Sequence, residues 1–176
     1  GILNHVEEYT LSELDLTNEI KGAQRLKKIR DEISKKFPMP RLKFPVFHED
    51  LSNQWVLVSN YIEGPTLEER LSDGSASWDD LLQLFRITGA FVFGVGTFHG
   101  DLHPGNAILN DKGEFVFIDN ASISTAPENV RRALFGFFSH LARGELSQAY
   151  EELLGMSVIE IKGKKKEKYL NGMKKL

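Results

Sequence analysis

Apolar residues recur every three or four positions through residues 17–36, which is the spacing of a helix with one buried face. Asp15 or Thr17 can cap the start of this helix, and Pro38 and Pro40 end it. The outward positions are rich in Lys and Arg, which indicates a solvated face. The apolar positions are Ile20, Ala23, Leu26, Ile29, Ile33 and Phe37.

The pattern then changes to two short apolar segments, residues 43–48 and 54–59, separated by a polar turn. This arrangement predicts an antiparallel pair of strands. Pro45 lies in the first segment and favours an edge or a bulge there, because proline has no N–H to donate to a neighbouring strand.

Two capping boxes follow. Thr66 to Glu69 opens a short helix, and Ser77 to Asp80 opens a long apolar helix that runs to about Thr97. Glycines at 89, 94 and 96 weaken the end of the long helix, by about 1 kcal/mol each relative to alanine, or permit close packing. Its expected core-facing residues are Trp78, Leu81, Leu82, Phe85, Val92 and Val95.

Residues 108–109 and 115–118 read as the strands of a hairpin around a turn at 110–113, with Gly113 suited to positive φ. A helix starting near Pro127 and ending at Gly144 follows, and then a shorter one that ends at Gly155. The whole pattern predicts an α+β fold that is mostly helical, with few strands.

Composition narrows the class of protein. The 176 residues have a formal net charge of −3 and no Cys, which excludes disulfides and Cys-based zinc sites and gives no reason to expect nucleic-acid binding. The most apolar run, residues 89–98, is too short to span a membrane, and no signal peptide is visible. We therefore expect a cytoplasmic location.

Residues 162–176 form a Lys-rich tail. We expect this tail to be a frayed, solvated terminus; the alternative is a peripheral contact with an anionic membrane surface.

The chemistry concentrates in residues 99–119, which begin H-G-D-L-H-P-G-N. Asp101, Asn106 five residues later and Asp119 after the hairpin have the spacing of a phosphoryl-transfer site, in which one Asp accepts the proton of the attacking hydroxyl and the Asn and second Asp hold Mg²⁺. The hairpin places both expected metal ligands, Asn106 and Asp119, at the same end of one rigid element. The alternative is that these are ordinary turn residues. His99 is expected to brace the loop through hydrogen bonds.

The phrase F-H-G-D-L-H-P-G-N at residues 98–106 resembles the catalytic loop of the UbiB/AarF-type atypical kinases, which are associated with coenzyme Q biosynthesis. E-L-D at residues 13–15 resembles that family's E-x-D motif, Y-I-E-G at 61–64 resembles its hinge, and residues 134–156 resemble its late helices. Aminoglycoside and choline phosphotransferases share H-G-D-x-x-x-x-N, so a small-molecule kinase of that type is the alternative.

The resemblance implies a protein-kinase-like fold that uses ATP and Mg²⁺. Residues 1–60 would be a partial small lobe with one helix and two antiparallel strands, residues 61–161 the large lobe with the catalytic-loop hairpin, and residues 162–176 the basic tail.

Roles are carried over by position. Asp101 would be catalytic, Asn106 and Asp119 would hold the metal, and Glu19 would orient a nucleotide-clamping Lys. The backbone at Asn60, Tyr61 and Ile62 would meet the adenine. His103 stands where many protein kinases place a phosphate-contacting Lys, which favours atypical or small-molecule chemistry with a lipid or small-molecule acceptor.

Three departures from the family pattern lower the expected activity. No Lys or Arg precedes Lys21, so this chain lacks the clamping Lys and the small lobe is truncated. Asp119 is followed by Asn120 and Ala121 where kinases have Phe and Gly, and the chain ends soon after Met156. The chain alone is therefore expected to be weakly active or inactive, and a non-catalytic pseudokinase scaffold is a further alternative.

Overall fold

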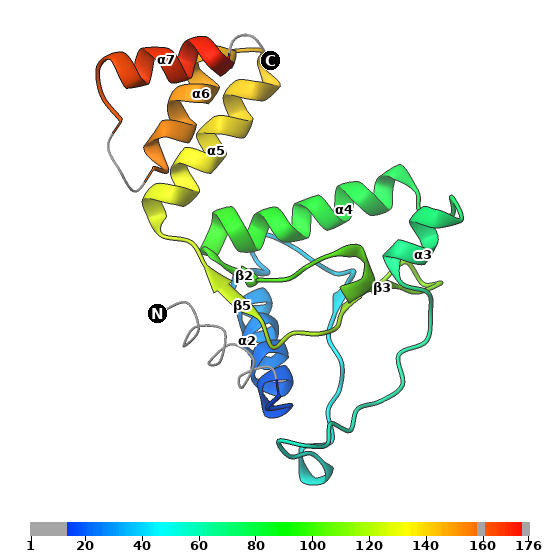
Figure 1. The fold of residues 1–176 in the computed structure, drawn as a ribbon. Coiled ribbons are helices and arrows are strands. Elements are labelled where there is room, and N and C mark those ends of the chain that lie inside the picture. The colour runs from blue at the N-terminus through cyan, green and yellow to red at the C-terminus, as the bar shows by residue number, and fades with distance from the viewer. Residues whose placement is uncertain (1–13, 158–160, 174–176) are drawn as a thin grey trace. The chain divides into compact units, whose positions relative to one another are not determined.

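The computed structural model describes residues 14–157 and 161–173 (Figure 1). Glu13 of the E-x-D motif, and Lys174 and Lys175 of the tail, lie outside these residues. The helices are α2 (Thr17–Ile33), α3 (Leu67–Ser72), α4 (Trp78–Gly89), α5 (Glu128–Ala142), α6 (Leu146–Gly155) and α7 (Lys164–Met173). The strands are β1 (Leu42–Lys43), β2 (Thr97–His99), β3 (Ala107–Leu109), β4 (Phe115–Phe117) and β5 (Ile123–Thr125). Short helical turns are η1 (Glu49–Leu51), the π-helical η2 (Ala90–Val95) and η3 (Pro104–Asn106).

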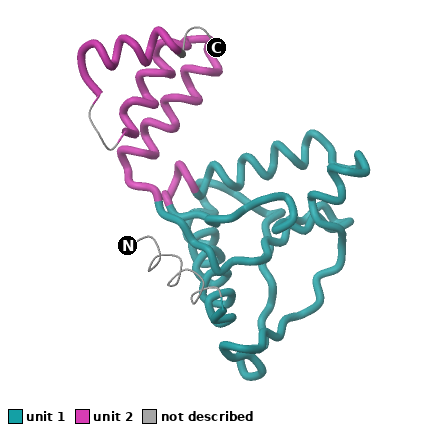
Figure 2. The backbone as a smooth tube through the Cα atoms, in the orientation of Figure 1, with its two compact units in different colours: residues 1–91, 97–125 teal, residues 92–96, 126–176 magenta. Residues whose placement is uncertain are grey.

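The chain divides into two compact units, one of residues 1–91 and 97–125 and the other of residues 92–96 and 126–176 (Figure 2). The fold is mostly helical with small sheets, as the sequence predicts. In the described residues, no helix combines the length and the apolar character that crossing a bilayer would require.

The first unit is built around the predicted hairpin. β3 and β4 pair antiparallel, with Ala107 opposite Phe117, and Gly113 in the turn has a φ of +71°. Both strands are buried throughout, and β4 lies between β3 and β1. The core around this sheet contains Leu26, Met39, Leu42, Leu67, Ile87, Ala90, Phe91, Ala107, Leu109, Phe115 and Phe117.

The predicted antiparallel strands 43–48 and 54–59 are found only in part. Phe47 and Ser59 form an antiparallel bridge, and the flanking N–H groups of His48 and Asn60 donate to Val58 and Val46. The start of the first segment does not pair with the second segment, because β1 pairs parallel with β4. Pro45 interrupts the first segment, so the residues before it pair with β4 and Phe47 after it pairs with Ser59.

Both capping boxes are confirmed. The hydroxyl of Thr66 accepts the N–H of Glu69, and the hydroxyl of Ser77 accepts the N–H of Asp80. The Glu69 and Asp80 carboxylates accept the N–H groups of Thr66 and Ser77 in return. These caps fix where α3 and α4 begin, and α3 then packs against η3, the turn that carries Asn106.

The predicted core face of α4 is wrong at three of its positions. Trp78 and Phe85 are 77% and 71% exposed, and Leu82 is also exposed. Leu81 packs on the core as predicted, and the core also receives Leu84 and Ile87, which were not among the predicted positions. The apolar residues form one broad face of this helix, and their periodicity does not show which part of that face is buried. The helix continues into the π-helical η2 and stops at Gly96, whose φ is +85°.

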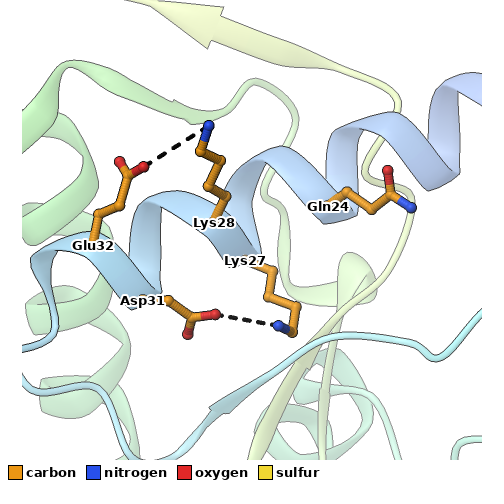
Figure 3. A pocket seen from close by; sticks show the side chains of 5 residues that line it. All are labelled: Gln24, Lys27, Lys28, Asp31 and Glu32. Carbon is orange, nitrogen blue, oxygen red and sulfur yellow. Dashed lines mark hydrogen bonds and ion pairs between the residues drawn. The ribbon is translucent and has the colours of Figure 1, made fainter.

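The outer face of α2 is solvated, as the sequence predicts. Figure 3 shows a shallow pocket there, where Lys27 pairs with Asp31 at 3.2 Å and Lys28 with Glu32 at 4.0 Å. Such exposed pairs contribute little to stability.

The second unit contains a helical hairpin of α5 and α6, followed by α7, which packs against α6. Gly144, with a φ of +73°, allows the tight turn after α5, and the buried residues Ala133 and Ala149 keep the helices close. The expected frayed terminus is wrong for residues 164–173, which form α7 and pack against α6. Lys166 pairs with Glu151 at 2.5 Å, whereas the side chains of three other lysines of α7, Lys164, Lys165 and Lys168, are exposed. Contact of this helix with an anionic membrane stays a prediction.

Candidate functional site

The hairpin brings Asn106 and Asp119 together, although thirteen residues separate them. Asn106 comes just before β3, Asp119 follows β4, and the N–H of Ile118 donates to the carbonyl of Asn106 at 3.0 Å. The Asn106 Nδ2 group donates to the Asp119 carboxylate at 3.3 Å and to the backbone carbonyl of Asp101 at 3.0 Å. One buried amide thus connects the three residues that the sequence predicts as base and metal ligands.

The side-chain oxygens of Asn106 and Asp119 suit a hard cation. Since Nδ2 of Asn106 makes both hydrogen bonds, its Oδ1 remains as a metal-binding oxygen beside the exposed carboxylate of Asp119. Among the described residues no cluster of three or more His, Cys, Asp or Glu side chains is arranged to hold a metal. Two protein oxygens completed by phosphate oxygens and water match the way Mg²⁺ binds in phosphoryl-transfer sites.

Asp119 has an unusual backbone. Its φ is +56°, and it is the only non-glycine residue with positive φ in the described part of the chain. This left-handed conformation costs about 1–2 kcal/mol for most residues and less for Asp, whose short polar side chain tolerates it. Surrounding contacts must therefore hold the Asp119 turn in place.

Asp101 is positioned by its backbone, and its carboxylate is exposed. Its N–H donates to Nδ1 of His99 at 3.2 Å, and Nε2 of the same ring bonds the carbonyl of Ile118 at 3.1 Å. Burial lowers the pKa of His99, so the imidazole is neutral at neutral pH, with one nitrogen accepting and the other donating. His99 also packs edge-on against Phe117. The expected bracing role of His99 is confirmed.

Pairing between β2 and β5 joins the two loops of the site. His99 lies opposite Ile123, and the N–H of Gly100 donates to the carbonyl of Ser122 at 2.8 Å. The loop that begins after His99 and the loop that ends before Ile123 are therefore held by one small ladder, which fixes Asp101 relative to Asp119.

His103 has a local structural contact. Its Nδ1 accepts the N–H of Gly105 at 3.1 Å, and it caps η3, where Pro104 stands at the first position. A Cβ on Gly105 would lie 2.8 Å from the His103 ring, so a larger residue there would displace that ring. The role of His103 toward phosphate stays a prediction.

Glu19 contacts the loop that follows Asp119 directly. It is buried, and its two carboxylate oxygens accept the N–H groups of Asn120 at 2.6 Å and Ala121 at 2.9 Å. Burial raises the pKa of Glu19, and these two donors oppose that rise. The predicted role of Glu19 in orienting a Lys is not tested by these contacts.

The expected adenine-contacting segment follows the Phe47–Ser59 bridge. The N–H of Asn60 already donates to Val46, and its side chain bonds His48 at 2.8 Å. Tyr61 is 91% exposed and Ile62 is half-buried. Adenine binding by residues 60–62 stays a prediction.

Two residues of the site were not foreseen. A Cβ on Gly22 would lie 1.7 Å from the carbonyl oxygen of Asn120, so α2 touches the backbone of the loop after Asp119 at this glycine. Asn120 is fully buried, and its Nδ2 donates to the carbonyl of Phe117 at 2.9 Å. The signal in the sequence was a glycine inside a regular helix, which usually marks close packing.

Known proteins resemble this chain over most of its length. Residues 1–153 match the family described as ABC1 atypical kinase-like domain. The chain is 27% identical over 146 residues to "Protein ACTIVITY OF BC1 COMPLEX KINASE 3, chloroplastic" of Arabidopsis thaliana, which covers 80% of this chain and 20% of the relative. It is 26% identical over 154 residues to "AarF domain-containing protein kinase 1" of Xenopus tropicalis, covering 81% and 28%.

A solved structure supports the fold. The complex of Rv3197 with erythromycin from Mycobacterium tuberculosis superposes with a TM-score of 0.61 at 23% identity, over 87% of this chain and 38% of the other. The chain thus spans much less than half the length of these relatives. Its sequence match and its kinase-like fold lead to one conclusion: the chain belongs to the ABC1 atypical kinase-like family.

Proposed function

We propose that this chain is the catalytic-loop part of an ATP- and Mg²⁺-dependent phosphotransferase or ATPase of the UbiB/AarF type. The observation that carries the proposal is the Asn106 amide, which ties the backbone of Asp101 to the carboxylate of Asp119. Asp101 would accept the proton of the attacking hydroxyl, and Asn106 and Asp119 would hold Mg²⁺. The bound ion would offset the negative charge of the nucleotide phosphates.

The nucleotide would bind with its adenine at the backbone of residues 60–62 and its phosphates near His103. The acceptor would be a lipid or another small molecule, in line with the link of UbiB-type proteins to isoprenoid quinone synthesis. The support is the family membership and the intact Asp101–Asn106–Asp119 cluster.

A second candidate is a phosphotransferase acting on a cationic small molecule. A polar hollow along α3 favours it, lined by Thr66, Glu68, Glu69, Ser72 and Asp73. Glu69 is engaged in the capping box, but the Glu68 carboxylate lies 3.1 Å from where a Cβ on Gly105 would be, beside the catalytic loop. A carboxylate there could attract an ammonium group of the acceptor.

Replacing Asp119 by alanine should remove most of the thermal stabilisation that MgATP gives to the wild-type chain. A ligand at 100 times its Kd stabilises a protein by about 2.7 kcal/mol, and the variant loses the one anionic metal ligand that we assign. The measurement is the rise in Tm on adding MgATP, each variant being compared with its own ligand-free form.

Asp111→Ala is the matched control for that experiment. Asp111 lies in the turn at the far end of the same hairpin and pairs with Arg70 at 2.7 Å, so its loss should leave the MgATP effect intact. Equal MgATP shifts in the wild type and in Asp119→Ala would refute the metal assignment.

ATP turnover by the 176-residue chain alone should be close to background. No Lys or Arg precedes Lys21, so the phosphate charge in the transition state has few compensating cations. The assay is ADP formation from ATP with and without choline, kanamycin or a short-chain isoprenoid phenol. Sustained ADP formation that Asp101→Asn abolishes would contradict the expected inactivity, and dependence on a cationic acceptor would favour the second candidate. Nucleotide binding without turnover under all conditions would fit the pseudokinase alternative.

A further inference from the structure

The loop after Asp119 is held by helix α2 at a distance of about a hundred residues along the chain. Glu19 accepts the N–H of Asn120 at 2.6 Å and the N–H of Ala121 at 2.9 Å, one on each carboxylate oxygen. Hydrogen bonds from backbone N–H groups to a carboxylate are among the stronger ones, and two of them fix the orientation as well as the position of the loop.

The two N–H groups converge because of the Asp119 backbone. A left-handed residue in a chain of otherwise ordinary conformations turns successive N–H groups toward one side, where they form a concave site for an anionic acceptor. Asp119 has a φ of +56°, and the N–H groups that follow it point at a single carboxylate. The Glu19 carboxylate therefore fills a site that the left-handed turn creates.

Two further contacts hold the helix and the loop together. Gly22 lies one turn after Glu19, and its lack of a side chain lets the carbonyl oxygen of Asn120 come within 1.7 Å of the place a Cβ would occupy. On the other side, the buried Asn120 amide donates to the carbonyl of Phe117 at 2.9 Å. The loop is thus fixed from α2 and from the end of β4.

We infer that Glu19 is a positioning residue for the metal ligand Asp119, acting through the backbone of Asn120 and Ala121 and needing no lysine to do so. This inference rests on the proposed function, because it assumes that Asp119 holds Mg²⁺. In this chain Glu19 already has two backbone partners, so α2 supports the loop after Asp119 through this carboxylate.

The test compares Glu19→Gln with Glu32→Gln in the full 176-residue chain. Glutamine has one acceptor oxygen, so its amide NH₂ must face one of the two N–H donors. Glu32 carries the same change on the exposed face of α2, where its pair with Lys28 spans 4.0 Å. The probe is the β,γ-imido analogue of ATP, and its Kd is measured by calorimetry with excess Mg²⁺ and again with EDTA.

We expect Glu19→Gln to weaken binding in Mg²⁺ by about 10-fold or more, the usual effect of losing a group that orients a metal ligand. Binding in EDTA should stay unchanged, as should both affinities of Glu32→Gln. A merely structural defect would weaken the two conditions alike. The amide hydrogen exchange of Asn120 and Ala121, followed by NMR, should accelerate in Glu19→Gln alone.

Glu19→Asp keeps both oxygens and the charge but shortens the reach by one methylene, so it serves if Glu19→Gln does not fold. If both Glu19 variants bind the ATP analogue in Mg²⁺ as tightly as the wild type does, the inference is overturned and the proposed function still stands. A wild type whose affinity is the same in Mg²⁺ and in EDTA would overturn the proposed function, and the inference with it.

Discussion

Replacing Phe115 by alanine is expected to destabilise the first unit by about 3–5 kcal/mol, the usual cost of deleting a buried aromatic ring. Phe115 has no exposed surface and sits in β4, the strand between β1 and β3. The guanidinium of Arg41 lies 5.3 Å from the ring centre and also hydrogen-bonds the carbonyl of Gly113 in the hairpin turn. The substitution would leave a cavity at the centre of the sheet.

The measurement is the free energy of unfolding from urea titration followed by far-UV circular dichroism. Since whole domains are commonly stable by only about 5–15 kcal/mol, the variant should be largely unfolded at moderate denaturant. Phe85→Ala is the control, because Phe85 is 71% exposed on α4 and its loss should change stability by about 0.5 kcal/mol or less. Similar losses for the two variants would show that the burial of Phe115 does not determine the stability of the hairpin.

The parts of the fold that depend on neighbours in sequence could be predicted. The hairpin, with its turn at residues 110–113, and the two capping boxes are each specified by residues within about ten positions of one another, so local chemistry decides them. The parallel pairing of β1 with β4 joins Leu42 to Phe115, and no local signal identifies such a distant partner.

Helix faces show a different limit. The sequence located α4 and its capped start correctly but assigned Trp78 and Phe85 to the core, where Leu84 and Ile87 are found. The apolar face of this helix is broad, and periodicity does not show which part of a broad face is buried. In α7 the error has the opposite sign, because a segment expected to be solvated is partly buried. Its lysines suggested a solvated tail, whereas Tyr169 and Leu170 are half-buried in a helix that packs on α6.

For the candidate site, spacing along the chain predicted which residues meet but not what holds them. Asp101, Asn106 and Asp119 come together as expected because one hairpin separates the last two and a tight loop the first two. The support of this cluster by Glu19 spans 101 residues of sequence, and family resemblance suggested a lysine partner for Glu19. Only the folded chain shows that backbone N–H groups occupy both of its oxygens.

Gly22→Ala is expected to be unusually harmful for a substitution in a helix. Alanine favours helix by about 1 kcal/mol over glycine, so an exposed site would gain stability. At position 22 the new Cβ would fall 1.7 Å from the Asn120 carbonyl oxygen, so α2 must move away from the loop. Overpacking of this kind usually costs about 1–3 kcal/mol and occasionally more. We expect the net loss of unfolding free energy to lie near the upper end of that range. The Asn120 backbone cannot move easily, because Glu19 and the buried Asn120 side chain hold it in place.

The control is Gly172→Ala in α7, where a Cβ would meet no atom within 4 Å and stability should hold or rise slightly. Urea unfolding measures both variants, and amide exchange at Asn120 and Ala121 reports whether Glu19 still reaches them. Movement of α2 large enough to admit a methyl group would stretch hydrogen bonds that are now 2.6 and 2.9 Å long, so exchange at both amides should accelerate in Gly22→Ala. A stable Gly22→Ala variant with unchanged exchange would contradict the close contact between α2 and the loop after Asp119. Loss of stability together with faster exchange would mean that position 22 requires glycine. Without a side chain there, α2 approaches the loop closely enough for Glu19 to hold the turn at Asp119.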